Sequence, residues 1–165
     1  MTGLLSLSGI MAELSQHAQK IAEGLLNQSA KMPGGKPIAK NKRTPILMLV
    51  GNSQTRDYLS SLLAENNYFP VLVTDPDELL HSLKEKQFAI ILIDCSAIIY
   101  YGTRILSKIK VCCRLCRIII FCDRQHLCDK VHREFIKEVM NIGVYACILA
   151  PYKEWEVLTM FSYYP

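Results

Sequence analysis

The sequence lacks the features that would place the protein in a membrane or send it out of the cell. No apolar run approaches the roughly 18 residues that a membrane-spanning helix needs. The apolar stretch at residues 4–11 follows no positive charge other than the terminus, and it lacks a convincing small-residue cleavage site, unlike a secretory signal peptide. We therefore expect a soluble, cytoplasmic protein with no membrane span.

The sequence also lacks the motifs of catalysis. It has no glycine-rich phosphate loop, no Ser-His-Asp set and no paired carboxylates spaced for acid and base work. These absences remove the common hydrolase and nucleotide-dependent classes, and we expect the protein not to be an enzyme.

Cysteine is not scarce, but its seven copies do not form a pattern of disulfides. The number is odd, and several cysteines fall in stretches that are typical of core strands, which indicates a reducing compartment. Cys113 and Cys116 have a spacing found in zinc and redox sites, yet four ligands would require scattered residues such as Cys128 and His132. We expect no metal and no cofactor, and thiols that act mainly as small hydrophobes.

Charge is unevenly distributed along the chain. Residues 1–44 carry six of the 19 Lys and Arg residues and two of the 15 acidic residues, whereas residues 45–165 carry 13 of each. Residues 29–44 contain prolines and glycines that break helices and strands, and they predict a basic, flexible linker. A solvated tether is the favoured interpretation, with contact to nucleic acid or anionic lipid as alternatives.

Residues 1–28 have the pattern of one amphipathic helix. Apolar residues recur at alternating intervals of three and four over about three heptads, as in a short coiled coil. This stripe predicts a partner-binding helix that forms a homodimer or docks in a partner's groove, while packing on its own domain and a membrane-surface position are alternatives. The stripe consists of Leu4, Leu7, Met11, Leu14, Ala18, Ile21 and Leu25.

From residue 45 onward, predicted strands alternate with predicted helices. The strands are expected at 45–50, 71–73, 88–93, 117–122 and 144–149, and the helices at 53–66, 76–86, 103–113, 123–141 and 153–163. This order predicts an α/β fold, a doubly wound (βα)5 unit with a parallel five-stranded sheet and an N-terminal helical extension.

The central predicted strand ends at a carboxylate. Residues 88–93 are apolar without polar alternation, which is typical of a strand buried on both faces, and Asp94 follows at once. Ligands of open α/β sheets collect at the carboxyl ends of the strands, so Asp94 is the candidate for chemistry.

The order of elements resembles a response-regulator receiver domain over roughly residues 45–165. Asp94 matches the phospho-acceptor, Gly102 follows eight residues later, and residues 143–152, GVYACILAPY, are similar to the family's glycine-alanine turn, fifth strand and Lys-Pro-aromatic signature. The resemblance implies a flavodoxin-like sheet with strand order 2-1-3-4-5 and a place in bacterial two-component signalling.

The departures from that family fall in the phospho-acceptor pocket. The resemblance places Gly51 and Asn52 where two carboxylates hold Mg²⁺, Cys122 where a hydroxyl stands, and Ala150 where a lysine stands. Cys147 replaces the aromatic switch residue, and Ile98 replaces a proline. The expected vestigial pocket therefore comprises Gly51, Asn52, Asp94, Cys122 and Ala150.

These departures predict a pseudo-receiver, a binding module or adaptor that acts without phosphorylation. Its protein partners would use the helix 1–28 and the face of the fourth helix, fifth strand and fifth helix of the (βα)5 unit. One alternative is an atypical phospho-accepting response regulator, and the less favoured one is a nucleic-acid-associated regulator that uses the basic arm.

Overall fold

The computed structural model describes residues 43–162 together with residues 16 and 20. The last two, Gln16 and Lys20, are helical and exposed. The predicted helix 1–28 and linker 29–44 otherwise lie outside the described residues, apart from residues 43 and 44. Among the described residues, no helix combines the length and the apolarity needed to cross a bilayer.

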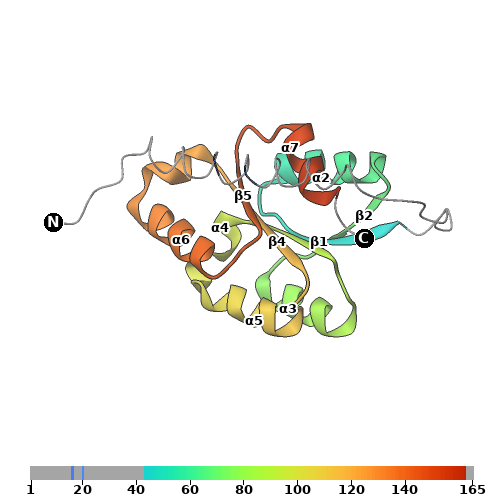
Figure 1. Ribbon diagram of the computed structural model, residues 1–165, viewed down its shortest axis with the longest axis horizontal. Helices are drawn as coiled ribbons and strands as arrows, with labels where there is room; N and C mark the ends of the chain where they lie inside the picture. Colours follow the sequence, from blue (N-terminus) through green and yellow to red (C-terminus); the bar gives the residue numbers. More distant parts are fainter. Residues whose placement is uncertain (1–15, 17–19, 21–42, 163–165) are drawn as a thin grey trace.

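Five parallel strands form one sheet in the order β2-β1-β3-β4-β5 (Figure 1). This order confirms the predicted doubly wound fold. The β3 strand lies in the middle of the sheet. Its five residues are all buried, as expected for a strand that helices cover on both faces. The strands are β1 (Thr44–Leu49), β2 (Tyr68–Leu72), β3 (Ile90–Asp94), β4 (Arg117–Cys122) and β5 (Ala146–Leu149).

Helices cover both faces of the sheet in two layers. One layer packs on Ile91 and Ile93 of β3 and contains α3 (Pro76–Glu85), α4 (Cys95–Ile98), α5 (Arg104–Cys112) and α6 (Lys130–Asn141). The other packs on Ile90 and Leu92 and contains α2 (Ser53–Glu65) and α7 (Glu154–Phe161). Two 3-10 helices, η1 (Ile99–Tyr101) and η2 (Arg124–Cys128), complete the described elements.

The predicted helix 123–141 was wrong in its first part. Asp129 has extended backbone angles (φ −85°, ψ 132°), and its side chain accepts the N–H of Val131 at 3.3 Å, so α6 begins only after it. Asp123 caps η2 in the same way, by accepting the N–H of Gln125 at 3.1 Å. Short acidic side chains bond to nearby backbone groups and so compete with a continuous helix.

Smaller corrections concern α2 and β2. The N-cap of α2 is Asn52, one residue before the predicted start at 53, and Tyr58 within the helix is 40% exposed. The β2 strand begins three residues before the predicted 71–73, because Tyr68 already pairs with Thr44. Gly143 follows Ile142, the C-cap of α6, and its φ of +86° is a value that glycine adopts without a Cβ penalty.

Candidate functional site

Asp94 is the last residue of β3 and the one buried charged side chain in the described part of the chain. It is 8% exposed. Its Oδ1 accepts the N–H of Ser96 at 3.1 Å, so the carboxylate is also the N-cap of the short helix α4. No ion pair joins Asp94 to a Lys or Arg among residues 43–162.

The loop after β1 lies beside this carboxylate but adds no second one. A Cβ placed on Gly51 would lie 3.9 Å from Oδ2 of Asp94, so the two residues are neighbours. The amide oxygen of Asn52 accepts the N–H of Thr55 at 3.0 Å and caps α2. In the receiver domains that the sequence resembles, both positions supply carboxylates. Here Gly51 has no side chain, and the side-chain oxygen of Asn52 already accepts a hydrogen bond in the cap of α2.

Cys122 and Ala150 meet at the ends of β4 and β5. The N–H of Ala150 donates to the carbonyl of Cys122 at 3.0 Å. The Cys122 side chain is fully buried, and it packs in the apolar cluster between the sheet and the layer that contains α6. The Ala150–Pro151 peptide bond that follows is cis.

Three cysteine thiols lie together in the apolar cluster on the α6 side of the sheet, those of Cys95, Cys122 and Cys147. The sulfurs of Cys122 and Cys147 lie 3.4 Å apart, and both residues are free cysteines. Hydrogen bonds with Cys147 and with Cys95, together with burial, raise the pKa of Cys122 well above its ordinary value. Cys122 pairs with Leu149 and Cys147 pairs with Ile120, so the two cysteines are diagonal neighbours on adjacent strands. The thiol of Cys122 is therefore neutral.

Tyr152, which follows the cis Ala150–Pro151 bond, lies at the same edge of the sheet, and the sequence patterns assign it no role in the pocket. Burial and then the negative charge of Asp94 raise the pKa of its phenol. Its ring meets Phe121 edge-on at 5.0 Å, and its carbonyl accepts the hydroxyl of Tyr58 at 3.1 Å. The aromatic position after Pro151 in the receiver-like signature was the available signal. The charge of Asp94 thus acts on a phenol whose raised pKa keeps it neutral.

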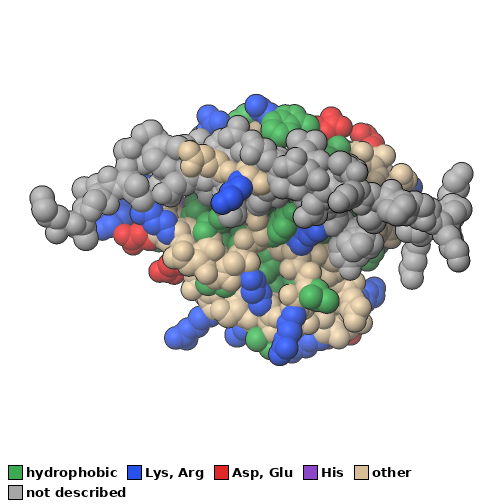
Figure 2. All heavy atoms as spheres, viewed as in Figure 1, with side chains coloured by type: hydrophobic (Ala, Val, Ile, Leu, Met, Phe, Trp, Pro, Cys, Tyr) green, Lys and Arg blue, Asp and Glu red, His purple; other side chains and the backbone are tan. Residues whose placement is uncertain are grey.

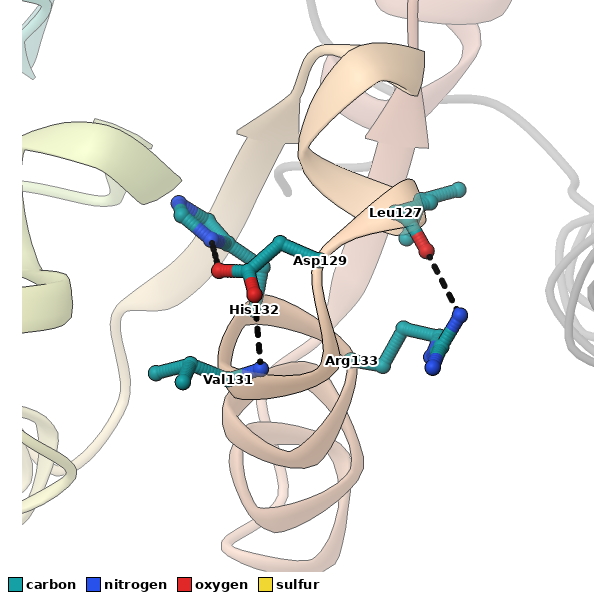
Figure 3. A network of polar contacts seen from close by, with 5 residues as sticks. All are labelled: Leu127, Asp129, Val131, His132 and Arg133. Atoms are coloured by element: carbon teal, nitrogen blue, oxygen red, sulfur yellow. Dashed lines mark hydrogen bonds and ion pairs between the residues drawn. The ribbon is translucent and has the colours of Figure 1, made fainter. Parts of the chain in front are cut away.

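The joint between η2 and α6 holds a second polar network (Figure 3). Nδ1 of His132 lies 2.6 Å from Oδ2 of Asp129, and this contact lowers the pKa of Asp129. The ring of His126 stacks on that of His132 at 4.6 Å. Arg133 donates to the carbonyl of Leu127 at 3.4 Å. These contacts fix the start of α6, within the predicted partner face.

Metal ligands are not gathered at either place. Among residues 43–162, no group of three or more His, Cys, Asp or Glu side chains is arranged to hold a metal ion. The pocket does bring Gly51, Asp94, Cys122 and Ala150 to one edge of the sheet, with Asn52 following Gly51. Among these five residues, Asp94 is the one with a charged side chain.

Comparison with known proteins places this geometry in a known fold. No family model matches the sequence, and no curated protein matches it. A receiver domain of an HD domain-containing protein from Pseudomonas fluorescens is similar, with a TM-score of 0.61 and 18% identity over 73% of this chain and 92% of the other. A CheY-like receiver from Methanospirillum hungatei gives 0.60 and 18%, over 73% and 91%.

A third similar structure contains a magnesium ion. It is the receiver domain of a sensor histidine kinase from Pseudomonas aeruginosa, with a magnesium ion coordinated in its active site cleft. The TM-score is 0.57 and the identity 21%, over 71% of this chain and 93% of that chain. Residues 43–162 of this chain therefore have the fold of the response-regulator receiver domains.

Proposed function

We propose that this chain is a pseudo-receiver, a non-catalytic protein-protein interaction module that acts in two-component signalling without phosphorylation at Asp94. The observation that carries the proposal is the composition of the pocket around that carboxylate. Gly51 contributes no ligand, the oxygen of Asn52 caps α2, and Ala150 contributes no cation.

The energetic reason is the charge on an incoming phosphoryl group. Its oxygens would approach a carboxylate that forms no ion pair with a Lys or Arg of residues 43–162, and Mg²⁺ needs several oxygen ligands to enter and offset that charge. Removing one charge-stabilising group costs about 100- to 1,000-fold in rate. Here the carboxylates, the lysine and the hydroxyl of a working pocket are all replaced.

The means of reporting phosphorylation are replaced as well. Cys122 and Cys147 stand where a hydroxyl and a switch aromatic would, and their sulfurs contact each other inside the apolar cluster. Neither thiol is hydrogen-bonded to Asp94 among the described contacts, so neither has a bond through which a change at Asp94 would be reported. The surface of α6, β5 and α7 would then present one constant shape to partners.

That surface offers side chains suited to binding. Trp155 on α7 is 63% exposed and Val131 on α6 is 62% exposed. Exposed aromatic residues are common anchors of protein interfaces. The predicted helix 1–28 would supply the second contact, through its apolar stripe from Leu4 to Leu25.

The test uses the full chain with Mg²⁺ and acetyl phosphate. We expect no mass increase of one phosphoryl group and no shift on a phosphate-affinity gel. A conventional receiver domain treated in parallel shows that the donor is active, and an Asp94→Asn variant shows whether any label is on Asp94. Mg²⁺-dependent labelling that Asp94→Asn abolishes would establish the alternative, an atypical phospho-accepting regulator.

A further inference from the structure

The turn that joins α5 to β4 has a cysteine at each end. Helix α5 ends at Cys112, and Cys113 is its C-cap. Arg114 and Leu115 form the turn that leads to Cys116. In a β-turn the first and fourth Cα atoms lie within about 7 Å, and most disulfides join Cα atoms about 4.4 to 6.8 Å apart. The backbone therefore places Cys113 and Cys116 at a separation that a disulfide can span.

Hydrogen bonds hold both of these free thiols at the turn. The thiol of Cys116 donates to the carbonyl oxygen of Cys113 at 2.9 Å. The thiol of Cys113 donates to the carbonyl oxygen of Phe88, shortly before β3, at 3.4 Å. Burial, and then a side-chain hydrogen bond with Cys113, raise the pKa of Cys116 to about 12. The two side chains are therefore neighbours, and Cys116 keeps its proton.

The turn is open to solvent. Cys113 and Cys116 are each partly buried, and Leu115 between them is 91% exposed. The three thiols that lie together on the α6 side of the sheet are buried instead. A small oxidant in solution therefore reaches the pair at the turn more readily than it reaches the buried thiols.

The surroundings of the turn are positively charged. Residues 95–122 contain five Lys and Arg residues and no Asp or Glu. The charge of Lys110 favours the thiolate of Cys116, against the larger effect of burial. Figure 2 shows Lys and Arg side chains gathered along the lower rim, where Figure 1 places α3 and α5. Positive, partly exposed surroundings are typical of reactive cysteines.

We propose that Cys113 and Cys116 form a redox-active dithiol, which hydrogen peroxide oxidises to an intramolecular disulfide. Because Cys116 keeps its proton, Cys113 is the thiol that attacks the oxidant. Disulfides of reducing compartments are usually transient and redox-sensing, so the pair agrees with the compartment that the cysteine pattern indicates. A metal is a poorer match, because among residues 43–162 no three or more ligands are arranged to hold one.

The oxidation has two steps. The thiolate of Cys113 attacks one oxygen of the peroxide, the O–O bond breaks, and a sulfenic acid and one water are formed. The sulfur of Cys116 then loses its proton and attacks the sulfur of Cys113, so that an S–S bond forms, the S–O bond breaks and a second water leaves. The two thiols together lose two electrons and two protons. A small dithiol reverses the reaction by thiol–disulfide exchange.

The disulfide also changes contacts outside the pair. Oxidation removes both thiol hydrogens, so the carbonyl oxygens of Phe88 and Cys113 lose these donors. Phe88 lies between α3 and β3, so the change extends from the turn to a second segment of the chain.

The experiment treats the reduced full chain with hydrogen peroxide, blocks the remaining thiols with iodoacetamide and maps tryptic peptides by mass spectrometry. Trypsin cleaves after Lys110, Arg114 and Arg117, so the two cysteines fall on separate peptides, 111–114 and 115–117. We expect a disulfide to link these peptides in the treated chain, and the link to disappear after dithiothreitol. A 2-Cys peroxiredoxin treated in parallel shows that the oxidant is active.

Variants assign the link to the pair. Cys113→Ser and Cys116→Ser should each lose it entirely, and Cys116→Ala repeats the test without a new hydroxyl. The matched control is Cys112→Ser, which changes the exposed neighbour in α5 and should keep the link. Circular dichroism should show every chain folded. The proposal is overturned by three results: no linked peptides in the folded, treated chain, a link that persists in Cys113→Ser, or loss of the link in Cys112→Ser.

Discussion

Asp94 holds two structural positions at once, and these are enough to explain its presence. It ends the central strand and its Oδ1 caps α4 through the N–H of Ser96. An N-cap carboxylate stabilises a helix start without any phosphate chemistry. An aspartate at the end of the third strand of this fold is therefore not by itself a sign of phosphorylation. Whether it can accept a phosphoryl group depends on the neighbouring side chains.

The pocket has room for the carboxylates that it lacks. A Cβ on Gly51 would make an ordinary van der Waals contact, 3.9 Å from Asp94. An aspartate at position 52 has two oxygens, so one can cap α2 while the other is available to a metal ion. In a Gly51→Asp/Asn52→Asp variant, we expect Mg²⁺ affinity to rise by roughly tenfold or more, because three carboxylates would then converge.

Isothermal titration of the Gly51→Asp/Asn52→Asp variant measures this gain. Adding Asp94→Asn to the same variant is the control, and it should remove most of the new affinity. Equal Mg²⁺ affinity in the unaltered chain and the variant would show that the site is closed by something other than missing ligands.

The seven thiols should differ sharply in reactivity. Burial, followed by a hydrogen bond with Cys113, raises the pKa of Cys116 to about 12, whereas Cys112 and Cys128 are exposed. Because only the thiolate is alkylated, at pH 8 Cys116 should react about 1,000-fold more slowly than an ordinary thiol. Its rate should rise about tenfold per pH unit until the pH nears its pKa.

Mass spectrometry of peptides from iodoacetamide-treated protein follows each site separately. Cys112 and Cys128 should be modified first, and the buried set of Cys95, Cys122 and Cys147 only after unfolding. Early modification of Cys122 in native protein would contradict the packing described for the pocket.

At the scale of elements, the sequence predicted what depends on local pattern and missed what depends on particular side-chain bonds. The five strands were predicted because unbroken β-branched and aliphatic runs have few other positions in a fold. The division of the predicted helix 123–141 into η2 and α6 at Asp129 was not predicted, because one continuous helix and a 3-10 helix followed by a capped helix have similar apolar spacing. The pocket positions Gly51 and Ala150 followed from the receiver-like landmarks, whereas the Cys95–Cys122 contact depends on rotamers that no spacing encodes.

The cap of α3 is a local bond whose contribution can be measured. Oδ1 of Asp75 accepts the N–H groups of Asp77 and Glu78 at 2.9 and 2.8 Å. Asp75→Ala leaves both donors without this acceptor and should lower the free energy of unfolding by about 1 kcal/mol. Urea unfolding measures the change. Asp75→Asn keeps an acceptor oxygen and should lose much less, and an equal loss would point to charge instead of capping.

At the scale of the whole molecule, two apolar clusters close the sheet from both sides. The cluster with α3 to α6 includes Leu79 and Phe135, and the cluster with α2 and α7 includes Leu59 and Met160. All buried apolar residues of the described part lie between Ile46 and Phe161. Burial of this kind is the main favourable contribution to folding, so the (βα)5 unit has its own source of stability.

This arrangement predicts that a chain shortened to residues 43–165 folds by itself. Its thermal unfolding should be cooperative, with a midpoint close to that of the full chain, because both faces of the sheet are already covered. Calorimetry measures the midpoint, and light scattering on the two chains measures their mass. If the apolar stripe from Leu4 to Leu25 drives self-association, the full chain should exceed the monomer mass and the shortened chain should not. An uncooperative transition of the shortened chain would mean that residues 1–42 complete the core, and the N-terminal helix would then be a structural part of the domain instead of a partner-binding element.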